Sequence, residues 1–385
     1  MKMVKAAVME EPGRMVTREF PYPEMKPGAL ILKVELSGIC GTDKHIWQGE
    51  THFYAGSPGD TQIPFPVIPG HEIVGVVADI TKEAVENLEY NGQKLREGDR
   101  VTICPDVLCG KCYFCRHTFG YGWCENGRAY GHHFSTSEWP ALYGGWAEYL
   151  YVRPDVITYK VPETIPPEVA VLTEPMVCTW ALDEAKACYQ LDNKGFGAGD
   201  TVVVLGQGPL GLLFTVKAQI LGAGMTIVTD ASVYRLEMAK RFGVDHAMDV
   251  RSTTAEERIQ FVKKMTGGLG ASVVVGCVNT PSAFVEGLEM LRKGGTFVEV
   301  GNFIDVGPCQ INVHRHFVAK NIHLIGRSNH PVTHYAQALR LFEKYSRTFP
   351  FQTMVTDRFA IGKAGQAMEK SVSLECMKVA IDPAL

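Results

Sequence analysis

Apolar residues alternate with polar ones in short runs through the first part of this chain. Examples are residues 29–36, 73–80 and 99–103, and Gly and Pro residues separate the runs. Alternation of this kind predicts half-buried β-strands, because successive side chains of a strand point to opposite faces. We therefore predict that residues 1–170 form a mainly β domain with antiparallel strands and long loops.

The pattern changes near Gly199. Compact apolar runs of strand type then alternate with helical stretches, and the runs are residues 201–206, 225–230, 272–276, 296–301 and 322–326. Strands that alternate with helices form βαβ units and a parallel sheet. Residues 171–327 are therefore predicted to be a doubly wound α/β domain. A helical stretch near 335–345 and a strand-like run at 378–381 follow, and we expect this tail, 328–385, to rejoin the first domain.

The first strand of the predicted α/β domain runs directly into the turn Gly206-Gln-Gly208-Pro209-Leu210-Gly211, and a helical stretch follows. In this context the glycines allow a tight turn and close approach to a pyrophosphate, and the helix N-terminus faces the phosphates. The turn therefore predicts a dinucleotide site. The alternative is an ordinary strand-to-helix turn with no ligand.

Asp230 ends the next predicted strand. An acid at this place accepts hydrogen bonds from the adenosine ribose and repels a 2′-phosphate, which favours NAD over NADP. In the alternative without a ligand, Asp230 only caps the helix that follows. Arg235 leaves NADP open, because a nearby arginine can hold a 2′-phosphate.

Four of the 11 cysteines lie in one short segment, at Cys109, Cys112, Cys115 and Cys124. Their spacing suits a tetrahedral zinc held by four thiolates, a closed shell that leaves no position for a substrate. We therefore predict a structural zinc, and the alternative is four unrelated buried cysteines. The clustering and the odd total favour metal binding in a reducing compartment over a disulfide framework, which places the protein in the cytoplasm.

A second set of metal-ligating residue types is dispersed along the chain. It comprises Cys40-Gly-Thr42-Asp43-Lys-His45, then Gly70-His71-Glu72, and then Glu174-Pro175. Catalytic zinc takes three protein ligands of Cys, His and carboxylate type and keeps a fourth position open. A single cysteine or histidine is more often an ordinary buried residue, so these segments alone leave the matter open.

Taken in order, these motifs and Gly-Asp-Arg-Val at 98–101 make nearly the whole chain resemble the zinc-containing medium-chain alcohol and polyol dehydrogenases. The resemblance implies a GroES-like catalytic domain joined to a Rossmann domain. It also implies that Cys40 and His71 ligate a catalytic zinc and that Glu72 or Glu174 supplies the carboxylate ligand. A glutamate at 174 is similar to the sorbitol, threonine and sugar dehydrogenase branch.

The same resemblance implies roles for three residues that follow Cys40. The alcohol proton leaves through the hydroxyl of Thr42, the cofactor ribose and then His45, because histidine as a residue type is suited to proton transfer near neutral pH. Asp43 accepts the second ring N–H of His71 and fixes its tautomer. On sequence alone His45 can also be an exposed histidine without a role.

Charge and hydropathy narrow the class of partner. The formal net charge is −4 without a basic run, which excludes the electrostatic footprint of a nucleic-acid or anionic-membrane binder. No stretch of 18 unbroken apolar residues occurs, so no membrane span is expected. A small-molecule partner is favoured, and the resemblance makes it a secondary alcohol or its ketone.

Six aromatic residues near loops are candidates to line a pocket, and several of them are expected to be ordinary packing residues: Trp47, Phe53, Tyr54, Trp123, Tyr130 and Trp146. Their number favours a bulky or cyclic alcohol over a polyol. Two other functions stay open. One is a zinc-free, NADPH-dependent quinone or enoyl reductase of the same superfamily, and the other is a zinc-stabilised sensor without turnover. Relatives form dimers or tetramers, so we expect a homodimer or homotetramer with residues 301–313 at the contact.

Overall fold

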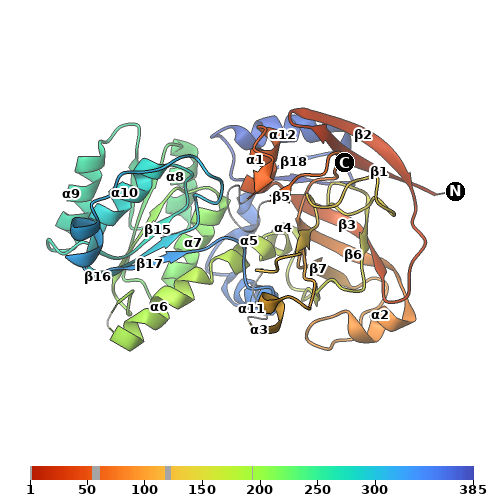
Figure 1. Cartoon of the computed structure of the whole chain (residues 1–385), viewed down its shortest axis with the longest axis horizontal. Helices are drawn as coiled ribbons and strands as arrows, with labels where there is room; N and C mark the ends of the chain where they lie inside the picture. Colours follow the sequence, from red (N-terminus) through yellow and green to blue (C-terminus); the bar gives the residue numbers. More distant parts are fainter. Residues whose placement is uncertain (1, 54–60, 118–122, 193) are drawn as a thin grey trace. The chain divides into compact units, whose positions relative to one another are not determined.

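The computed structural model describes residues 2–53, 61–117, 123–192 and 194–385 (Figure 1). The chain divides into two compact units, one formed by Met1–Val177 with Pro331–Leu385 and the other by Cys178–His330. The sequence pattern placed the two boundaries slightly earlier, after residues 170 and 327. In the described ranges, no helix is long and apolar enough to cross a membrane.

The first unit is built around a seven-stranded sheet. Its strands, in spatial order, are β11 (Thr158–Lys160), β7 (Arg100–Ile103), β6 (Glu72–Ile80), β3 (Leu30–Gly38), β19 (Lys378–Ile381) and β18 (Val355–Phe359), with β10 (Tyr149–Val152) also paired to β3. All neighbours are antiparallel except β18 and β19. Since β19 pairs with β3, the end of the chain completes this sheet.

Three two-stranded ribbons accompany this sheet: β1 (Met3–Glu11) with β2 (Arg14–Pro21), β4 (His52–Phe53) with β5 (Thr61–Gln62), and β8 (Asp106–Val107) with β9 (Arg128–Ala129). The unit's helices are short apart from α11 and α12. They are α1 (Gly41–Trp47), α2 (Lys82–Asn87), α3 (Tyr113–His117), α4 (Pro167–Ala170), α5 (Thr173–Cys178), α11 (Tyr335–Tyr345), α12 (Ala364–Val372) and the 3₁₀ turns η2 (Phe351–Met354) and η3 (Ile361–Lys363).

The second unit contains a six-stranded parallel sheet. Its spatial order is β14 (His246–Asp249), β13 (Met225–Asp230), β12 (Thr201–Leu205), β15 (Ala271–Gly276), β16 (Leu291–Glu299) and β17 (His323–Gly326). Numbered along the chain, this order is 3-2-1-4-5-6, the Rossmann arrangement that binds dinucleotides where the strand order reverses. The predicted fold class, a Rossmann domain joined to a GroES-like β domain, is therefore confirmed.

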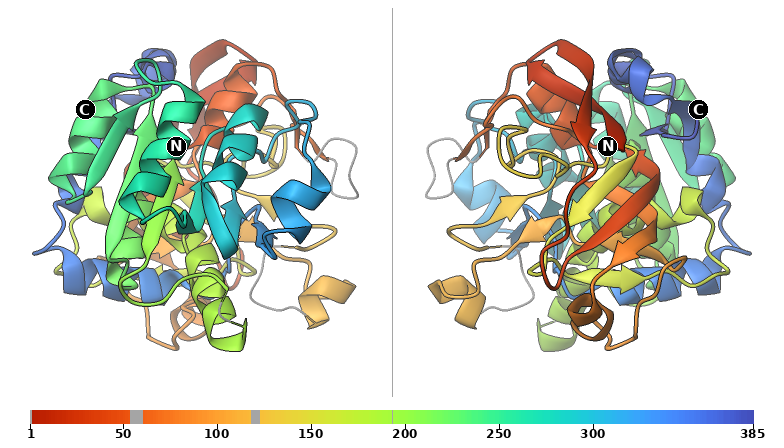
Figure 2. Two further views of the ribbon diagram at one scale, coloured as in Figure 1. Left: turned by 90° about the vertical axis from the view of Figure 1, so that its left-hand side faces the viewer. Right: turned by 90° about the vertical axis from the view of Figure 1, so that its right-hand side faces the viewer.

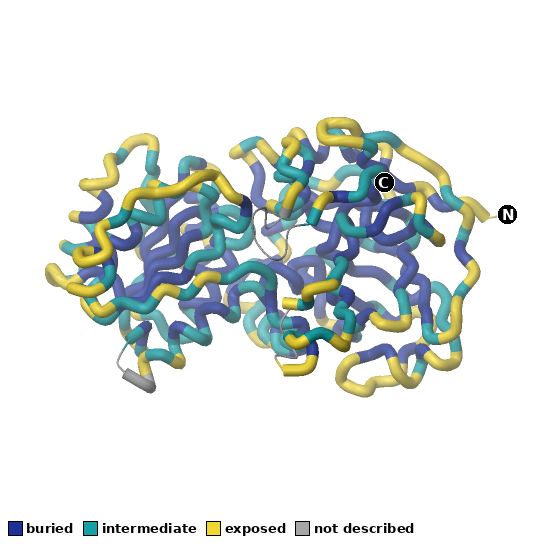
Figure 3. Tube along the Cα trace, in the orientation of Figure 1, coloured by how far each residue is buried: buried dark blue, intermediate teal, exposed yellow. Residues whose placement is uncertain are grey.

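Helices cover both faces of the parallel sheet (Figure 2). They are α6 (Ala181–Asp192), α7 (Pro209–Ile220), α8 (Val233–Arg241), α9 (Ala255–Met265) and α10 (Pro281–Met290), and a π-helical turn, η1 (His314–Val318), precedes β17. The residues of β12 and β15 are buried throughout, and the tube around the place of β15 is largely dark blue in Figure 3. This explains their valine-rich, non-alternating sequences, because a strand covered on both faces has no polar side.

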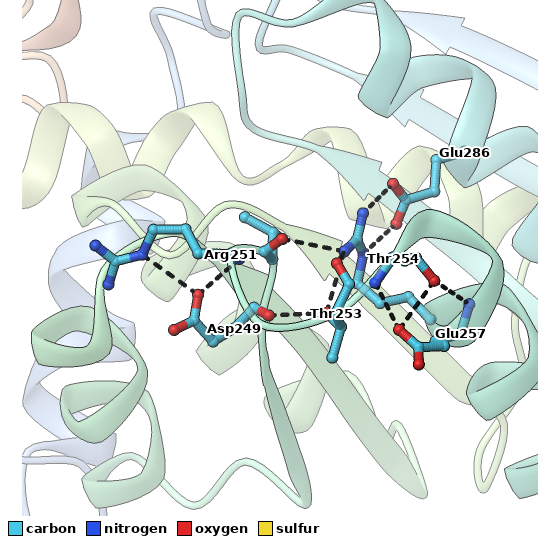
Figure 4. A network of polar contacts seen from close by, with 8 residues as sticks. Asp249, Arg251, Thr253, Thr254, Glu257 and Glu286 are labelled. Carbon is cyan, nitrogen blue, oxygen red and sulfur yellow. Dashed lines mark hydrogen bonds and ion pairs between the residues drawn. The ribbon is translucent and has the colours of Figure 1, made fainter.

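An ion pair between buried Arg258 and half-buried Glu286 joins the helices α9 and α10. The guanidinium of Arg258 donates from Nε and Nη2 to the two carboxylate oxygens of Glu286, each at 2.7 Å. At the start of α9, Thr254 and Glu257 form a capping box that satisfies free N–H groups of the first turn (Figure 4). These contacts fix the segment that follows β14 and have no direct part in the candidate site.

Candidate metal centres and cofactor turn

Cys40 lies at the point where β3 ends and α1 begins. It is the N-cap residue of α1, and its backbone N–H donates to Oδ2 of Asp43 at 2.8 Å. Asp43 is fully buried, and burial raises the pKa of its carboxyl group. Thr42 follows in the first turn, with its Oγ1 3.9 Å from the Sγ of Cys40. The helix start therefore fixes the thiol and the hydroxyl beside each other.

His71 is brought to this helix by the turn before β6. Gly70 has φ of +90°, and a Cβ atom there would lie 2.3 Å from Cδ1 of Trp146, so only glycine fits. The N–H of Gly70 donates to Oδ1 of Asp43 at 3.4 Å, and the same oxygen is 4.0 Å from Nδ1 of His71. Asp43 thus connects the Cys40 and His71 segments, but 4.0 Å is too long for the hydrogen bond from the His71 ring that the resemblance implied.

Three side chains raise the pKa of His71. Burial lowers the pKa of this imidazole, but Cys40, Asp43 and Glu174 outweigh burial and hold the pKa well above its ordinary value. Cys40 is within hydrogen-bonding reach of the ring, and Glu174 comes from the first turn of α5. The thiol of Cys40 and the carboxylate of Glu174, from distant parts of the sequence, therefore both act electrostatically on the His71 imidazole, although the ligand atoms of the three residues are not within 4.8 Å of one another.

Glu72 has a different partner. It is fully buried, and Nζ of Lys378 donates to both of its carboxylate oxygens, at 2.6 and 2.7 Å. Lys378 also donates to the carbonyl oxygen of Ile39 at 3.2 Å, next to Cys40. A Cβ atom on Gly38 would lie 1.9 Å from Oε2 of Glu72, so the glycine before Ile39 makes room for the carboxylate.

The donors around His71 fit a zinc ion. A thiolate, an imidazole and a carboxylate are the ligand types of catalytic zinc sites. Several acidic groups around one buried imidazole also call for a compensating cation.

The four predicted structural ligands lie together. The sulfur atoms of Cys109, Cys112, Cys115 and Cys124 are all within 4.8 Å of one another. The backbone N–H groups of Lys111 and Cys112 lower the pKa of Cys109 to about 6, whereas burial raises the pKa of Cys115 to about 12. Backbone donors aimed at sulfur and a tetrahedral set of four thiols fit a closed zinc site.

The glycine turn of the second unit has the geometry of a dinucleotide site. Gly206 has φ of +92°, and a Cβ atom on Gly211 would lie 1.9 Å from the carbonyl oxygen of Gly206. Gly208 caps α7, Pro209 occupies its first turn, where no N–H is needed, and Leu210 follows. The helix N-terminus is therefore open to an anion.

Asp230 ends β13 beside this turn. Its Oδ2 accepts the N–H of Gln207 at 2.6 Å, and its Oδ1 accepts the N–H of Ser232 at 2.7 Å. Each carboxylate oxygen has a second lone pair for another donor. A Cβ atom on Gly208 would lie 3.8 Å from Nη1 of Arg235. The guanidinium group of Arg235 is therefore close to the glycine turn.

Comparison with known proteins shows to which family this chain belongs. Residues 26–163 match the alcohol dehydrogenase GroES-like domain, and residues 209–344 match the zinc-binding dehydrogenase domain. A 5-exo-hydroxycamphor dehydrogenase of Pseudomonas putida is 31% identical over the whole of both chains. The chain belongs to the zinc-type medium-chain alcohol and polyol dehydrogenases.

Two other proteins agree with this family. A sorbitol dehydrogenase of Bacillus subtilis is 28% identical over 99% of this chain and 97% of its own. A zinc-binding dehydrogenase of Sinorhizobium meliloti 1021, solved bound to NADP, covers 100% of both chains with 25% identity and a TM-score of 0.81. The chain is thus an alcohol or polyol dehydrogenase that uses a nicotinamide cofactor.

Sequence reasoning missed the lysine that holds Glu72 in this dehydrogenase. Lys378 opens the apolar run of β19, and a charged residue at a buried strand position was the available signal. Its partner could not be found from one sequence, because 306 positions separate the two residues.

The aromatic residues proposed to line a substrate pocket give a mixed result. Tyr130 and Trp146 are fully buried in the core of the first unit, and Trp47 packs against that core. These three are packing residues, which corrects the prediction for them. Trp123 is exposed, and Tyr54 and the side chain of Phe53 lie outside the described part of the chain. The structure therefore gives no aromatic argument for a bulky substrate.

Proposed function

We propose that this dehydrogenase is zinc-dependent and NAD-linked, and that it oxidises a secondary alcohol to its ketone. The observation that carries the proposal is that the Cys40 thiol lies within hydrogen-bonding reach of buried His71, whose pKa Glu174 and Asp43 also raise. When bound there, zinc supplies a Lewis acid that polarises the alcohol oxygen and favours loss of its proton.

The three ligands we propose for this zinc are Cys40, His71 and Glu174. Glu72 is the less suitable carboxylate, because both of its oxygens already accept from Lys378. Its pairing neutralises a charge that would otherwise be buried alone. Asp43 orients His71, since a carboxylate behind a ligating imidazole fixes its tautomer and raises its basicity.

Thr42 and His45 carry the proton away in this proposal. They are three positions apart on α1 and therefore lie on one side of the helix. The hydroxyl of Thr42 lies beside Cys40, and His45 forms an ion pair with the partly exposed Glu50. A proton taken up at His45 thus reaches a group in contact with solvent.

The cofactor we propose is NAD. Asp230 carries negative charge at the position where a 2′-phosphate would lie, which opposes NADP. Arg235 is the feature that would admit NADP, and a structural relative was solved with that cofactor. The backbone N–H groups of Gln207 and Ser232 hold the Asp230 carboxylate in place. For this reason we propose NAD and not NADP.

For the substrate we propose a cyclic or bulky secondary alcohol first and a polyol second. The relative at 31% identity is named for a hydroxycamphor and another for sorbitol. The second zinc, at the four-cysteine site, is structural, and its reduced thiols support a cytoplasmic location. We also propose a homodimer or homotetramer with residues 301–313 at the contact, where Val306 and Val313 are exposed.

The test is a panel of cyclic secondary, acyclic secondary, primary and polyol substrates, each with NAD and with NADP. Production of the reduced cofactor is followed by its absorbance, with and without a zinc chelator. We expect turnover of secondary alcohols with NAD that the chelator abolishes. Turnover of a quinone or enoyl compound with NADPH that survives the chelator would establish the zinc-free reductase instead, and zinc without any turnover would indicate a sensor.

A further inference from the structure

The loops that follow β15 and β16 lie against each other in the second unit. A Cβ atom on Gly301 would lie 2.4 Å from the backbone N and O of Val278, and one on Gly276 would lie 2.4 Å from Oε2 of Glu299. Val278 also packs against the glycine turn, because a Cβ atom on Gly206 would lie 2.5 Å from its Cγ1. The two loops and the turn therefore border one edge of the sheet.

Glu299 organises the second of these loops. Its Oε1 accepts the N–H of Gly301 at 2.8 Å, the N–H of Asn302 at 2.9 Å and the side-chain Nδ2 of Asn302 at 3.1 Å. A single carboxylate oxygen thus receives three donors. The backbone and the side chain of Asn302 are both held by this acid.

This arrangement fixes which way the Asn302 amide faces. An ionised carboxylate only accepts, so the NH₂ group must face Glu299 and the oxygen Oδ1 must face away. That Oδ1 is buried and has no hydrogen-bond partner within the described part of the chain. A buried acceptor without a donor is costly, and a ligand that brings a donor removes the cost.

The place of Asn302 in the sheet indicates the ligand. In the strand order 3-2-1-4-5-6 the adenosine half of a dinucleotide lies over the strand that ends at Asp230, and the other half lies over the fourth and fifth strands. These are β15 and β16, and Asn302 comes after β16. The nicotinamide riboside half carries two kinds of donor, the ribose hydroxyls and the carboxamide NH₂ of the ring, and only the NH₂ belongs to the reactive ring.

We propose that Oδ1 of Asn302 accepts a hydrogen bond from the nicotinamide carboxamide and that Glu299 is the positioning residue that aims it. The inference rests on the proposed cofactor site and adds a residue that recognises the reactive ring. It applies equally to NAD and NADP, because both carry the same carboxamide.

The experiment compares two reduced cofactors by calorimetric titration of the full-length protein, so that no turnover is needed. One is NADH and the other is its 3-acetylpyridine analogue, in which a methyl group replaces the carboxamide NH₂. We expect the wild type to bind NADH roughly tenfold more tightly, the range for one buried hydrogen bond. Asn302→Ala should bind the two with nearly equal affinity.

Two further variants separate this role from a structural one. Asn279→Ala removes another buried amide oxygen without a described partner, in the loop after β15, and tests the rival assignment. We expect it to keep the NADH preference, and loss of the preference in this variant and not in Asn302→Ala would overturn the inference. Glu299→Gln should reduce the preference partly, because a glutamine amide can also donate and no longer forces one orientation on Asn302.

The outcomes distinguish this inference from the proposed function. If the wild type binds neither cofactor, the proposed function fails. If it binds both cofactors equally tightly, or if Asn302→Ala keeps the full preference, the carboxamide is recognised elsewhere and the inference is overturned while the cofactor site stands.

Discussion

The pair formed by Glu72 and Lys378 allows a sharp test of how the first unit holds its candidate metal site. Lys378 is 2% exposed and Glu72 is not exposed at all, so neither group has access to water. Changing Lys378 to Met leaves the Glu72 carboxylate buried without its partner. Loss of one partner of a buried ion pair costs about 3–5 kcal/mol. The carbonyl oxygen of Ile39 also loses its donor.

The assay is thermal unfolding followed by circular dichroism. For a unit of this size, a loss of that magnitude lowers Tm by roughly 6–20 °C. The double variant Glu72→Gln/Lys378→Met should recover most of the loss, because no charge stays buried, and Lys378→Arg should stay close to wild type. A Lys378→Met protein that unfolds within 2–3 °C of wild type, roughly 1 kcal/mol, would refute the reasoning. So would a double variant that is as unstable as the single one.

Three more predictions follow from the described contacts. Gly70→Ala should destabilise the protein by about 2–4 kcal/mol in denaturant unfolding, because its Cβ atom would overlap Trp146 and its φ is positive; an unchanged midpoint would show that the turn relaxes. Burial lowers the pKa of His133 to about 4, whereas an unfolded histidine titrates near 6.5. As the pH falls, His133 therefore takes up a proton in the unfolded chain before it does so in the folded protein, and this favours unfolding. Wild type should lose about 3 kcal/mol more than His133→Gln between about pH 6.5 and pH 4, and parallel stability curves would contradict this. After removal of zinc, Cys109 should be the first of the four clustered cysteines that iodoacetamide alkylates at pH 7, as mass spectrometry can show, because its pKa is about 6; equal labelling of all four would contradict this.

The sequence alone predicted those features whose residues lie close together along the chain. The valine-rich run of β12 leads into a glycine turn in which Gly211 has no room for a Cβ atom, because the carbonyl oxygen of Gly206 would lie 1.9 Å from it. Asp230 stood at the end of the next strand, as predicted, and Cys109, Cys112, Cys115 and Cys124 are close in sequence and in space. In each case the chemistry lies within one short segment or one βα unit.

Features that depend on distant parts of the chain could not be predicted. The choice between Glu72 and Glu174 needed the position of Lys378, which comes from the last strand. The edge strand β14 was missed because His246–Asp249 is half-buried and lacks β-branched residues. Tyr130 and Trp146 looked like pocket residues because nothing in a sequence distinguishes a buried aromatic from one that lines a site.

The most direct test of the central claim is the zinc content per chain, measured by plasma mass spectrometry on purified wild type, Cys40→Ser and Cys112→Ser. We expect two zinc ions in the wild type and one in each variant, with alcohol-dependent cofactor reduction lost in Cys40→Ser. If Cys40→Ser still binds two zinc ions, or if the wild type binds only the ion lost in Cys112→Ser, there is no zinc at His71 and the proposed mechanism is wrong.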